Sequence, residues 1–204
     1  MGTRNLTIVI KDNKLRLSQY GQWDGYFRYT GVRFLKFVKE NLQGNKKSHL
    51  SLMQAFGKKI DLLKSVGAVF VDKIVKDTFA YTNRYGESDT FIPVSYLLPQ
   101  FSRDTGVNIL NVINGLYPLD FGKKKYPIFL DSNGGGFCEY ANVIDMDTDE
   151  IYMLTCHEFT GESYTTCPLL DNIGMSCYYK SKITDLPSIK KITEIVKNQG
   201  IEVN

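Results

Sequence analysis

Alternating apolar and polar residues near both ends of the chain predict two β-hairpins. Apolar residues at 6, 8 and 10 precede a polar turn at 11–14, and the alternation resumes at 15–18. Branched and aromatic residues at 137–144 and 150–156 flank an acidic turn at 145–149. A period of two interrupted by a turn-forming stretch is typical of antiparallel strand pairs. Further strands are expected at 164–167 and 175–182.

A helical period separates the hairpins. Apolar residues about four apart predict helices at 32–42 and 48–63, the second capped by Ser48. Asp104 can cap a third helix, which stops at Asn114-Gly115, and the segment Asp185-Leu186-Pro187-Ser188 starts a closing helix. Loops or elements of undecided type are expected in between, at 69–80, 81–90 and 117–136. This order predicts one α+β domain over 1–204, with an antiparallel sheet built from the N-terminal and C-terminal hairpins and helices packed on one side.

Charge and hydropathy narrow the class of protein. The chain has 204 residues, 43% of them hydrophobic, and a formal net charge of +3. Its basic pairs are dispersed among acidic residues, which argues against general nucleic-acid binding. There is no secretory signal pattern and no apolar run long enough for a membrane helix. We therefore expect a cytoplasmic protein without a membrane partner; the sequence leaves the oligomeric state open, a homo-oligomer included.

Two patterns resemble metal sites but lack the required spacing. Alternate aspartates at 145–149 mimic the start of a calcium loop, but they lack the glycine and the closing glutamate. Cys156, His157, Cys167 and Cys177 match no usual zinc spacing. Free thiols and a solvated turn are expected, with no metal and no cofactor. Cys156 and His157 are neighbours at the end of a predicted strand, so their side chains are expected to point to opposite faces.

The best candidate site follows from the first hairpin. Antiparallel pairing brings the chain start, Thr3-Arg4, beside the segment 20–26 that ends the second strand. The polar and aromatic side chains expected to crowd this patch are those of Thr3, Arg4, Tyr20, Gln22, Trp23, Asp24 and Tyr26. Trp23 is the only tryptophan in the chain.

Five stretches of the chain resemble a family of uncharacterised proteins, many of them encoded by tailed bacteriophages, prophages and their hosts. These stretches are MGTRNLTIVI, YGQWDGY, LLPQFSRDTGVNIL, FCEYANVIDMDTDEIYML and TDLPSIKKI. The sequence departs from the usual form at Phe27, where a proline is common, and at Tyr140, where tryptophan is common. The resemblance implies a phage or mobile-element context and no established activity. It also marks Glu139 as a motif position beside those of the N-terminal hairpin.

These residue types suit the binding of a small anion that carries a planar ring. Arg4 can grip a phosphate or carboxylate with two parallel hydrogen bonds. Tyr20, Trp23 and Tyr26 can stack on a base, with Gln22 beside them. Asp24 or Glu139 can accept from a base edge or a ribose hydroxyl. The alternative is structural, with Trp23 in the core and Asp24 in a tight turn.

The leading hypothesis is a phage-associated cytoplasmic protein, in the host cytoplasm if phage-encoded. It would bind a nucleotide-like anion around the N-terminal hairpin and counter host defence by sequestering or degrading an immune signal. A second hypothesis is a hydrolase that uses Thr3 as an N-terminal-type nucleophile, or Asp24 and Glu139 as an acid and base pair. A third is a protein-interaction module that inhibits a host enzyme. Whether the protein is an enzyme stays open.

Overall fold

The computed structural model describes residues 3–63, 106–115 and 138–203. Its strands are β1 (Asn5–Ile10), β2 (Leu15–Gly21), β3 (Tyr140–Asp145), β4 (Glu150–Thr155) and β5 (Ser176–Lys182). Its α-helices are α1 (Val32–Val38), α2 (Lys46–Leu63), α5 (Ile109–Asn114) and α6 (Ile189–Asn198). π-helical turns flank α1 at Phe27–Gly31 and Lys39–Gln43, and 3-10 turns lie at Gly106–Asn108 and Pro168–Ile173.

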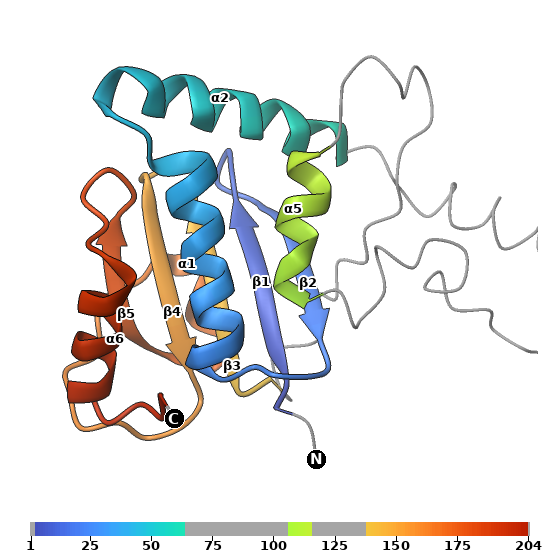
Figure 1. The fold of residues 1–204 in the computed structure, drawn as a ribbon. Helices are drawn as coiled ribbons and strands as arrows, with labels where there is room; N and C mark the ends of the chain where they lie inside the picture. The colour runs from blue at the N-terminus through green and yellow to red at the C-terminus, as the bar shows by residue number, and fades with distance from the viewer. Residues whose placement is uncertain (1–2, 64–105, 116–137, 204) are drawn as a thin grey trace, which may run out of the picture.

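The strands form one five-stranded sheet in the order β2-β1-β3-β4-β5 (Figure 1). Both predicted hairpins are present, as the antiparallel pairs β1–β2 and β3–β4, and β5 extends the second one. The hairpins join through β1 and β3, which run parallel with Asn5 opposite Tyr140. A parallel pair needs a long crossover connection, and the chain between β1 and β3 includes the helices α1, α2 and α5.

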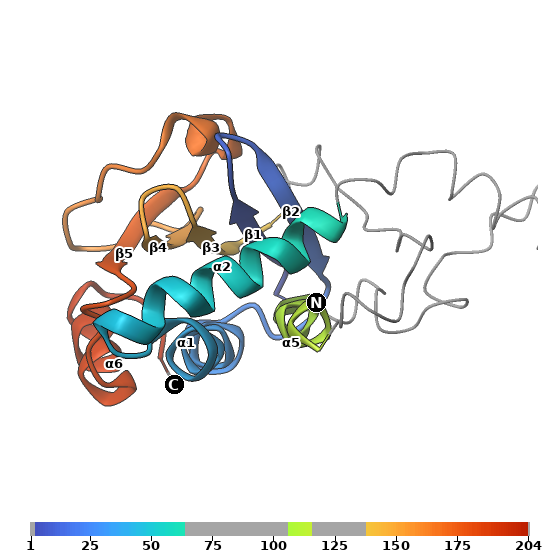
Figure 2. The same ribbon diagram turned by 90° about the horizontal axis from the view of Figure 1, so that it is seen from above.

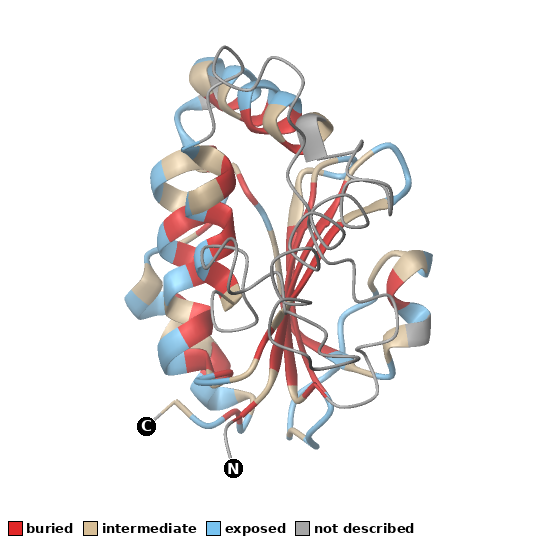
Figure 3. Cartoon of the chain, turned by 90° about the vertical axis from the view of Figure 1, so that its right-hand side faces the viewer, coloured by how far each residue is buried: buried red, intermediate tan, exposed pale blue. Residues whose placement is uncertain are grey.

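The α-helices that the structure describes lie against one face of this sheet, as predicted. Figures 2 and 3 show α1 and α6 beside the sheet, with α2 crossing above its upper end. Phe34, Leu35 and Phe56 from the helices meet Val9 and Ile144 from the strands in one buried cluster. On the opposite face, a second cluster includes Leu6, Ile8, Val143, Leu154 and, from the 3-10 turn, Leu170. Burial on both faces explains why every residue of β1 and β3 is buried.

The helix caps partly confirm the sequence prediction. Ser188 caps α6, its hydroxyl accepting from the Lys191 N–H at 3.3 Å. For α2 the predicted cap is wrong, because Asn45 takes that position. The Asn45 side chain accepts from the Ser48 N–H at 3.0 Å, and the Ser48 hydroxyl accepts from the Asn45 N–H at 2.9 Å. This reciprocal pair is a capping box, in which Ser48 holds the third helical position rather than the cap.

The remaining predictions divide between corrected and untested ones. The expected strand at 164–167 is reduced to one bridge, between Tyr164 and Cys177. The predicted Asp104 cap and the segments 69–80, 81–90 and 117–136 lie outside the described residues. Within the described part of the chain, no helix has the length and apolar character needed to cross a membrane.

Candidate functional site

The segment that follows β2 folds back onto the start of β1, at the lower end of the sheet in Figure 1. The Gly25 N–H donates to the Thr3 carbonyl at 3.1 Å. The Asn5 side-chain amide donates to the Trp23 carbonyl at 3.1 Å and to the Gly21 carbonyl at 3.3 Å. The structure therefore brings Thr3-Arg4 beside residues 21–25, as the hairpin pattern predicts.

Glycine suits the point where these two segments touch. A Cβ atom on Gly25 would lie 3.0 Å from the carbonyl oxygens of both Thr3 and Arg4, so a larger residue would push the two backbone segments apart by a few tenths of an ångström. The preceding Asp24 has a φ of +55°, in the left-handed region that aspartate tolerates better than most residues. Its carbonyl accepts from the Thr30 hydroxyl. Asp24 therefore shapes the turn through its backbone and leaves its carboxylate exposed.

Glu139 joins this patch from the start of β3. Its N–H donates to the Arg4 carbonyl at 3.0 Å, and its Oε1 accepts from the Arg4 N–H at 3.3 Å. We use the name N-terminal patch for Arg4, Trp23, Asp24, Tyr26 and Glu139. In this patch the Arg4 guanidinium forms no hydrogen bond or ion pair with any residue that the structure describes, although Arg4 is partly buried.

His157 is the functional candidate that the sequence analysis missed. Its Nε2 lies 3.3 Å from Oε2 of Glu139, and the two side chains are 49% and 34% exposed. β4 ends at Thr155, so Cys156 and His157 lie in a bend beyond the strand. The strand alternation behind the expectation of opposite faces does not apply in a bend, and both residues line one groove. The hairpin register could have revealed the pair, since Tyr140 opposite Thr155 sets Glu139 next to residues 156 and 157.

That groove has a volume of about 390 Å³ and adjoins the N-terminal patch through His157. Besides His157, its lining includes Cys156, Phe159, Ser163 and Ser176. The lining is therefore largely polar and carries hydroxyl, thiol and imidazole groups. A space of this size suits part of a nucleotide-sized ligand.

Two tyrosine rings continue from His157, one of the residues that line the groove. The ring of Tyr140 lies 5.5 Å from the ring of His157 and 6.0 Å from that of Tyr26, between centroids. Burial raises the pKa of Tyr140 to about 12, and the charge of Glu202 adds to the effect. Tyr140 is therefore a neutral phenol at physiological pH and holds His157 in place by packing.

The predicted site residues do not all face the same way. Tyr20 packs against the cluster on the far side of the sheet and donates its hydroxyl to Gln22 Oε1 at 2.7 Å. Tyr26 packs on the helix side. Thr3 is only 5% exposed, whereas Trp23 is 57% exposed and is not part of the core. Tyr20 and Gln22 are thus separated from the Tyr26 side of the patch.

The acidic turn at 145–149 is less solvated than predicted. Asp145 is buried and accepts from the N–H groups of Asp147 and Thr148. Asp147 accepts from the N–H groups of Asp12 and Asn13 at 2.8 and 2.7 Å. The carboxylates therefore tie the turns of the two hairpins together. No cluster of metal-ligand side chains occurs among the described residues, and all four cysteines are free thiols.

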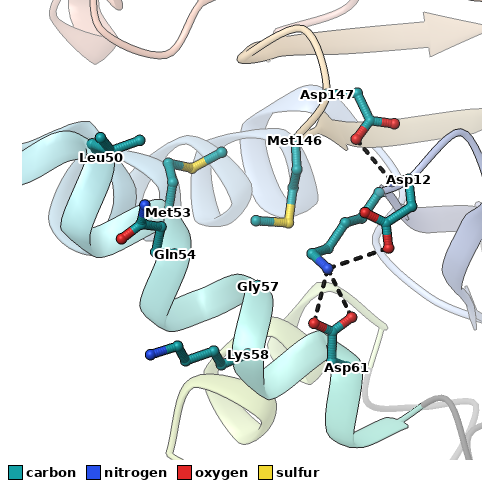
Figure 4. Close-up of a pocket in the computed structure, with 10 residues that line it drawn as sticks. Asp12, Leu50, Met53, Gln54, Gly57, Lys58, Asp61, Met146 and Asp147 are labelled. Carbon is teal, nitrogen blue, oxygen red and sulfur yellow. Dashed lines mark hydrogen bonds and ion pairs between the residues drawn. The ribbon is translucent and has the colours of Figure 1, made fainter.

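A second groove, of about 420 Å³, lies between α2 and the hairpin turns (Figure 4). Figure 4 shows Met53 on the α2 side of the groove and Met146 on the hairpin side, and Lys58 also lines it. Lys11 crosses it to both carboxylate oxygens of Asp61 at 2.8 Å. This ion pair raises the pKa of Lys11. The groove contains none of the residues predicted for the site.

Comparison of the chain with protein-family models, with curated proteins and with solved structures gives no match.

Proposed function

We propose that the N-terminal patch binds a small anionic, nucleotide-like ligand. The observation that carries this proposal is Arg4, a partly buried residue whose guanidinium has no partner among the described residues. Burying a charge is costly unless an opposite charge or several hydrogen bonds compensate it. An anion from outside the chain would supply that compensation.

The surroundings of Arg4 favour a nucleotide over a simple anion. The exposed Trp23 ring is carried by the segment that touches Thr3-Arg4, and its backbone is fixed by Asn5. Stacking of a base on an aromatic ring contributes about 1–3 kcal/mol. Asp24 and Glu139 supply acceptors for a ribose hydroxyl or a base edge. Phosphate recognition by Arg4 and base stacking by Trp23 would then act on one molecule.

The biological use that we propose comes from the resemblance to phage and prophage proteins. A nucleotide-binding protein made in an infected cell would act in the host cytoplasm. Its role would be counter-defence, by sequestering or degrading a nucleotide signal of host immunity.

Among the enzymatic alternatives, burial argues against Thr3 as a nucleophile. Its residue is 5% exposed, and a buried hydroxyl cannot reach a substrate without movement of the chain start. Glu139 is a stronger candidate, because its carboxylate lies between the Arg4 N–H and His157. That arrangement favours a hydrolase built on Glu139 as the second candidate function.

Fluorescence of the single tryptophan tests ligand binding directly. We expect AMP to quench Trp23 fluorescence, and adenosine and inorganic phosphate to bind at least tenfold more weakly, because each lacks one of the two contacts. Arg4→Ala should lower the affinity for AMP about tenfold or more, in line with the loss of a charge-assisted contact.

Lys58→Ala is the matched control, since it removes one positive charge from the exposed face of α2. It should leave the affinity for AMP unchanged. Equal affinity of the wild-type protein for AMP and adenosine, or equal losses in the Arg4 and Lys58 variants, would contradict the proposal.

A further inference from the structure

We propose that His157, oriented by Glu139, is a general base that hydrolyses a phosphodiester of a nucleotide held at the N-terminal patch. This inference rests on the proposed function and assigns a reaction to the same end of the sheet. It uses the groove beside His157 as the place for the reacting ester and its water.

The carboxylate beside His157 favours one tautomer of its ring. Nε2 lies 3.3 Å from Glu139 Oε2 in an ion-pair contact, and because an ionised carboxylate can only accept, a proton on Nε2 is the favourable arrangement. The neutral ring then carries its lone pair on Nδ1. Nδ1 has no hydrogen-bond partner among the described residues, which leaves it available to a water molecule. Carboxylate-oriented imidazoles act as bases through their free nitrogen in this way.

The backbone around the pair is rigid. The Thr155 hydroxyl donates to the Glu139 carbonyl at 3.0 Å and accepts from the His157 N–H at 3.1 Å. The Cys156 N–H donates to the same Glu139 carbonyl at 3.1 Å. These bonds fix the chain at both partners, and the Tyr140 ring limits the tilt of the imidazole. A base held this firmly needs little reorganisation before proton transfer.

The same carboxylate connects the base to the anion site. Glu139 Oε1 accepts from the Arg4 N–H, while Oε2 faces His157. The backbone of Arg4 and the ring of His157 therefore contact the same carboxylate, and we place the phosphodiester between the Arg4 and His157 side chains. Neighbouring groove residues Ser163 and Ser176 can donate hydroxyl hydrogen bonds to a non-bridging phosphate oxygen.

The reaction balances without a cofactor. His157 Nδ1 takes a proton from water as the water oxygen forms a bond to phosphorus. The bond between phosphorus and the leaving oxygen breaks, and the electron pair goes to that oxygen. The leaving group departs as an alkoxide that takes up a proton from solvent, and the imidazolium returns its proton to water. Arg4 stabilises the charge on the phosphoryl oxygens during transfer.

A chromogenic probe isolates the role of the base. The p-nitrophenyl ester of thymidine 5′-phosphate carries a leaving group that needs no acid, so turnover depends on activation of water. We expect the full-length protein to release p-nitrophenolate, and His157→Gln to lower kcat about 100-fold or more with KM within about threefold. Lys58→Ala is the control, because Lys58 lies on the exposed face of α2 in the other groove and should leave both constants unchanged.

A spectroscopic measurement tests the positioning role of Glu139. Imidazole ¹⁵N chemical shifts should report a proton on Nε2 of His157 in the wild-type protein and a mixture of both tautomers in Glu139→Ala. The same substitution should lower kcat about tenfold. A purely structural role would leave the tautomer of His157 unaltered.

The outcomes separate this inference from the proposed function. Binding of thymidine 5′-phosphate without turnover of the ester would overturn the inference and leave ligand binding intact. Turnover that survives in His157→Gln, or a loss of nucleotide binding in that variant equal to its loss of turnover, would also overturn it. If neither binding nor turnover occurs, both proposals fail.

Discussion

At the residue scale, the buried threonine on β1 offers the simplest test of how one hydroxyl affects the stability of the protein. Thr7 is fully buried, and its Oγ1 has no hydrogen-bond partner among the described residues. The residue opposite Thr7 on β3 is the buried Asn142. An unpaired buried polar group lowers stability by an amount comparable to a lost hydrogen bond.

Thr7→Val should therefore stabilise the protein by about 1 kcal/mol, because valine has the same shape and no polar atom. Chemical denaturation of the two proteins measures the difference. The matched control is Thr155→Val, which removes a buried hydroxyl that does form hydrogen bonds and should destabilise. Destabilisation by Thr7→Val would show that its hydroxyl is satisfied after all.

Single residues also show where the sequence stops being informative. The composition of the turn at 145–149 indicates a solvated acidic loop, but Asp145, Asp147 and Asp149 each have a distinct partner. Asp145 caps its own turn, Asp147 binds the backbone of the first hairpin, and Asp149 faces His49. The last two partners are 100 or more residues away in the chain. The local sequence pattern therefore predicts the turn but does not predict which distant groups its carboxylates contact.

At the scale of elements, His49 links α2 to the helical turn before it and to the turn between β3 and β4. Nδ1 lies 2.7 Å from the carbonyl of Leu42, in the preceding helical turn, and Nε2 lies 2.8 Å from Oδ1 of Asp149. The residue is buried at 8% exposure. α2 thus depends on this imidazole as well as on the apolar contacts of Phe56 and Ile60.

His49→Ala should destabilise the protein by about 2–4 kcal/mol, since it removes a buried ring and its polar contacts with the Leu42 carbonyl and Asp149. His157→Ala removes the only other histidine, which is half exposed, and should cost less than about 1 kcal/mol. Thermal unfolding of both variants checks the contrast. Similar losses in the two variants would contradict the anchoring role of His49.

The elements themselves are largely predictable from periodicity. Both hairpins, α1, α2 and the Ser188 cap follow from local patterns of two or about four residues. The parallel pairing of β1 with β3 does not, because its partners are separated by 135 residues or so and no local period encodes them. The strand expected at 164–167 fails for a related reason, since its apolar pattern finds only a single bridge partner.

At the scale of the whole molecule, the ionisation of Glu150 makes the stability of the fold depend on pH. Burial alone would raise its pKa, but hydrogen bonds from Tyr152, Lys180 and Lys182 together bring the pKa below its ordinary value of 4.5. A lowered pKa in the folded state means that this carboxylate stabilises the fold above the ordinary pKa. The contribution is lost as the pH falls through the lowered value.

Glu150→Gln should therefore be less stable than the wild type at neutral pH, and the difference should shrink between about pH 5 and pH 3. Urea denaturation over that range measures it. Glu158→Gln, at an exposed position, should show no such trend. A wild-type to Glu150→Gln difference that stays constant down to pH 3 would contradict the role of the ionised carboxylate.

The candidate site was predictable only in part. The hairpin pattern places Thr3-Arg4 beside 20–26, and the structure has that contact. Side-chain direction was beyond the pattern, because the chain leaves β2 before residue 22 and Tyr20 and Tyr26 pack on opposite faces of the sheet. The role of His157 depends on a bend that follows β4, where strand alternation no longer applies.

The two grooves at opposite ends of the molecule make the central claim testable by one measurement. A titration with AMP, followed by ¹H–¹⁵N NMR of the labelled protein, locates the ligand. We predict shifts of the single Trp23 indole N–H and of the backbone amides of Arg4 and Glu139. Gln54 and Lys58, in the α2 groove, should not move. Shifts confined to Gln54 and Lys58, or no shifts at millimolar AMP, would contradict nucleotide binding at the N-terminal patch.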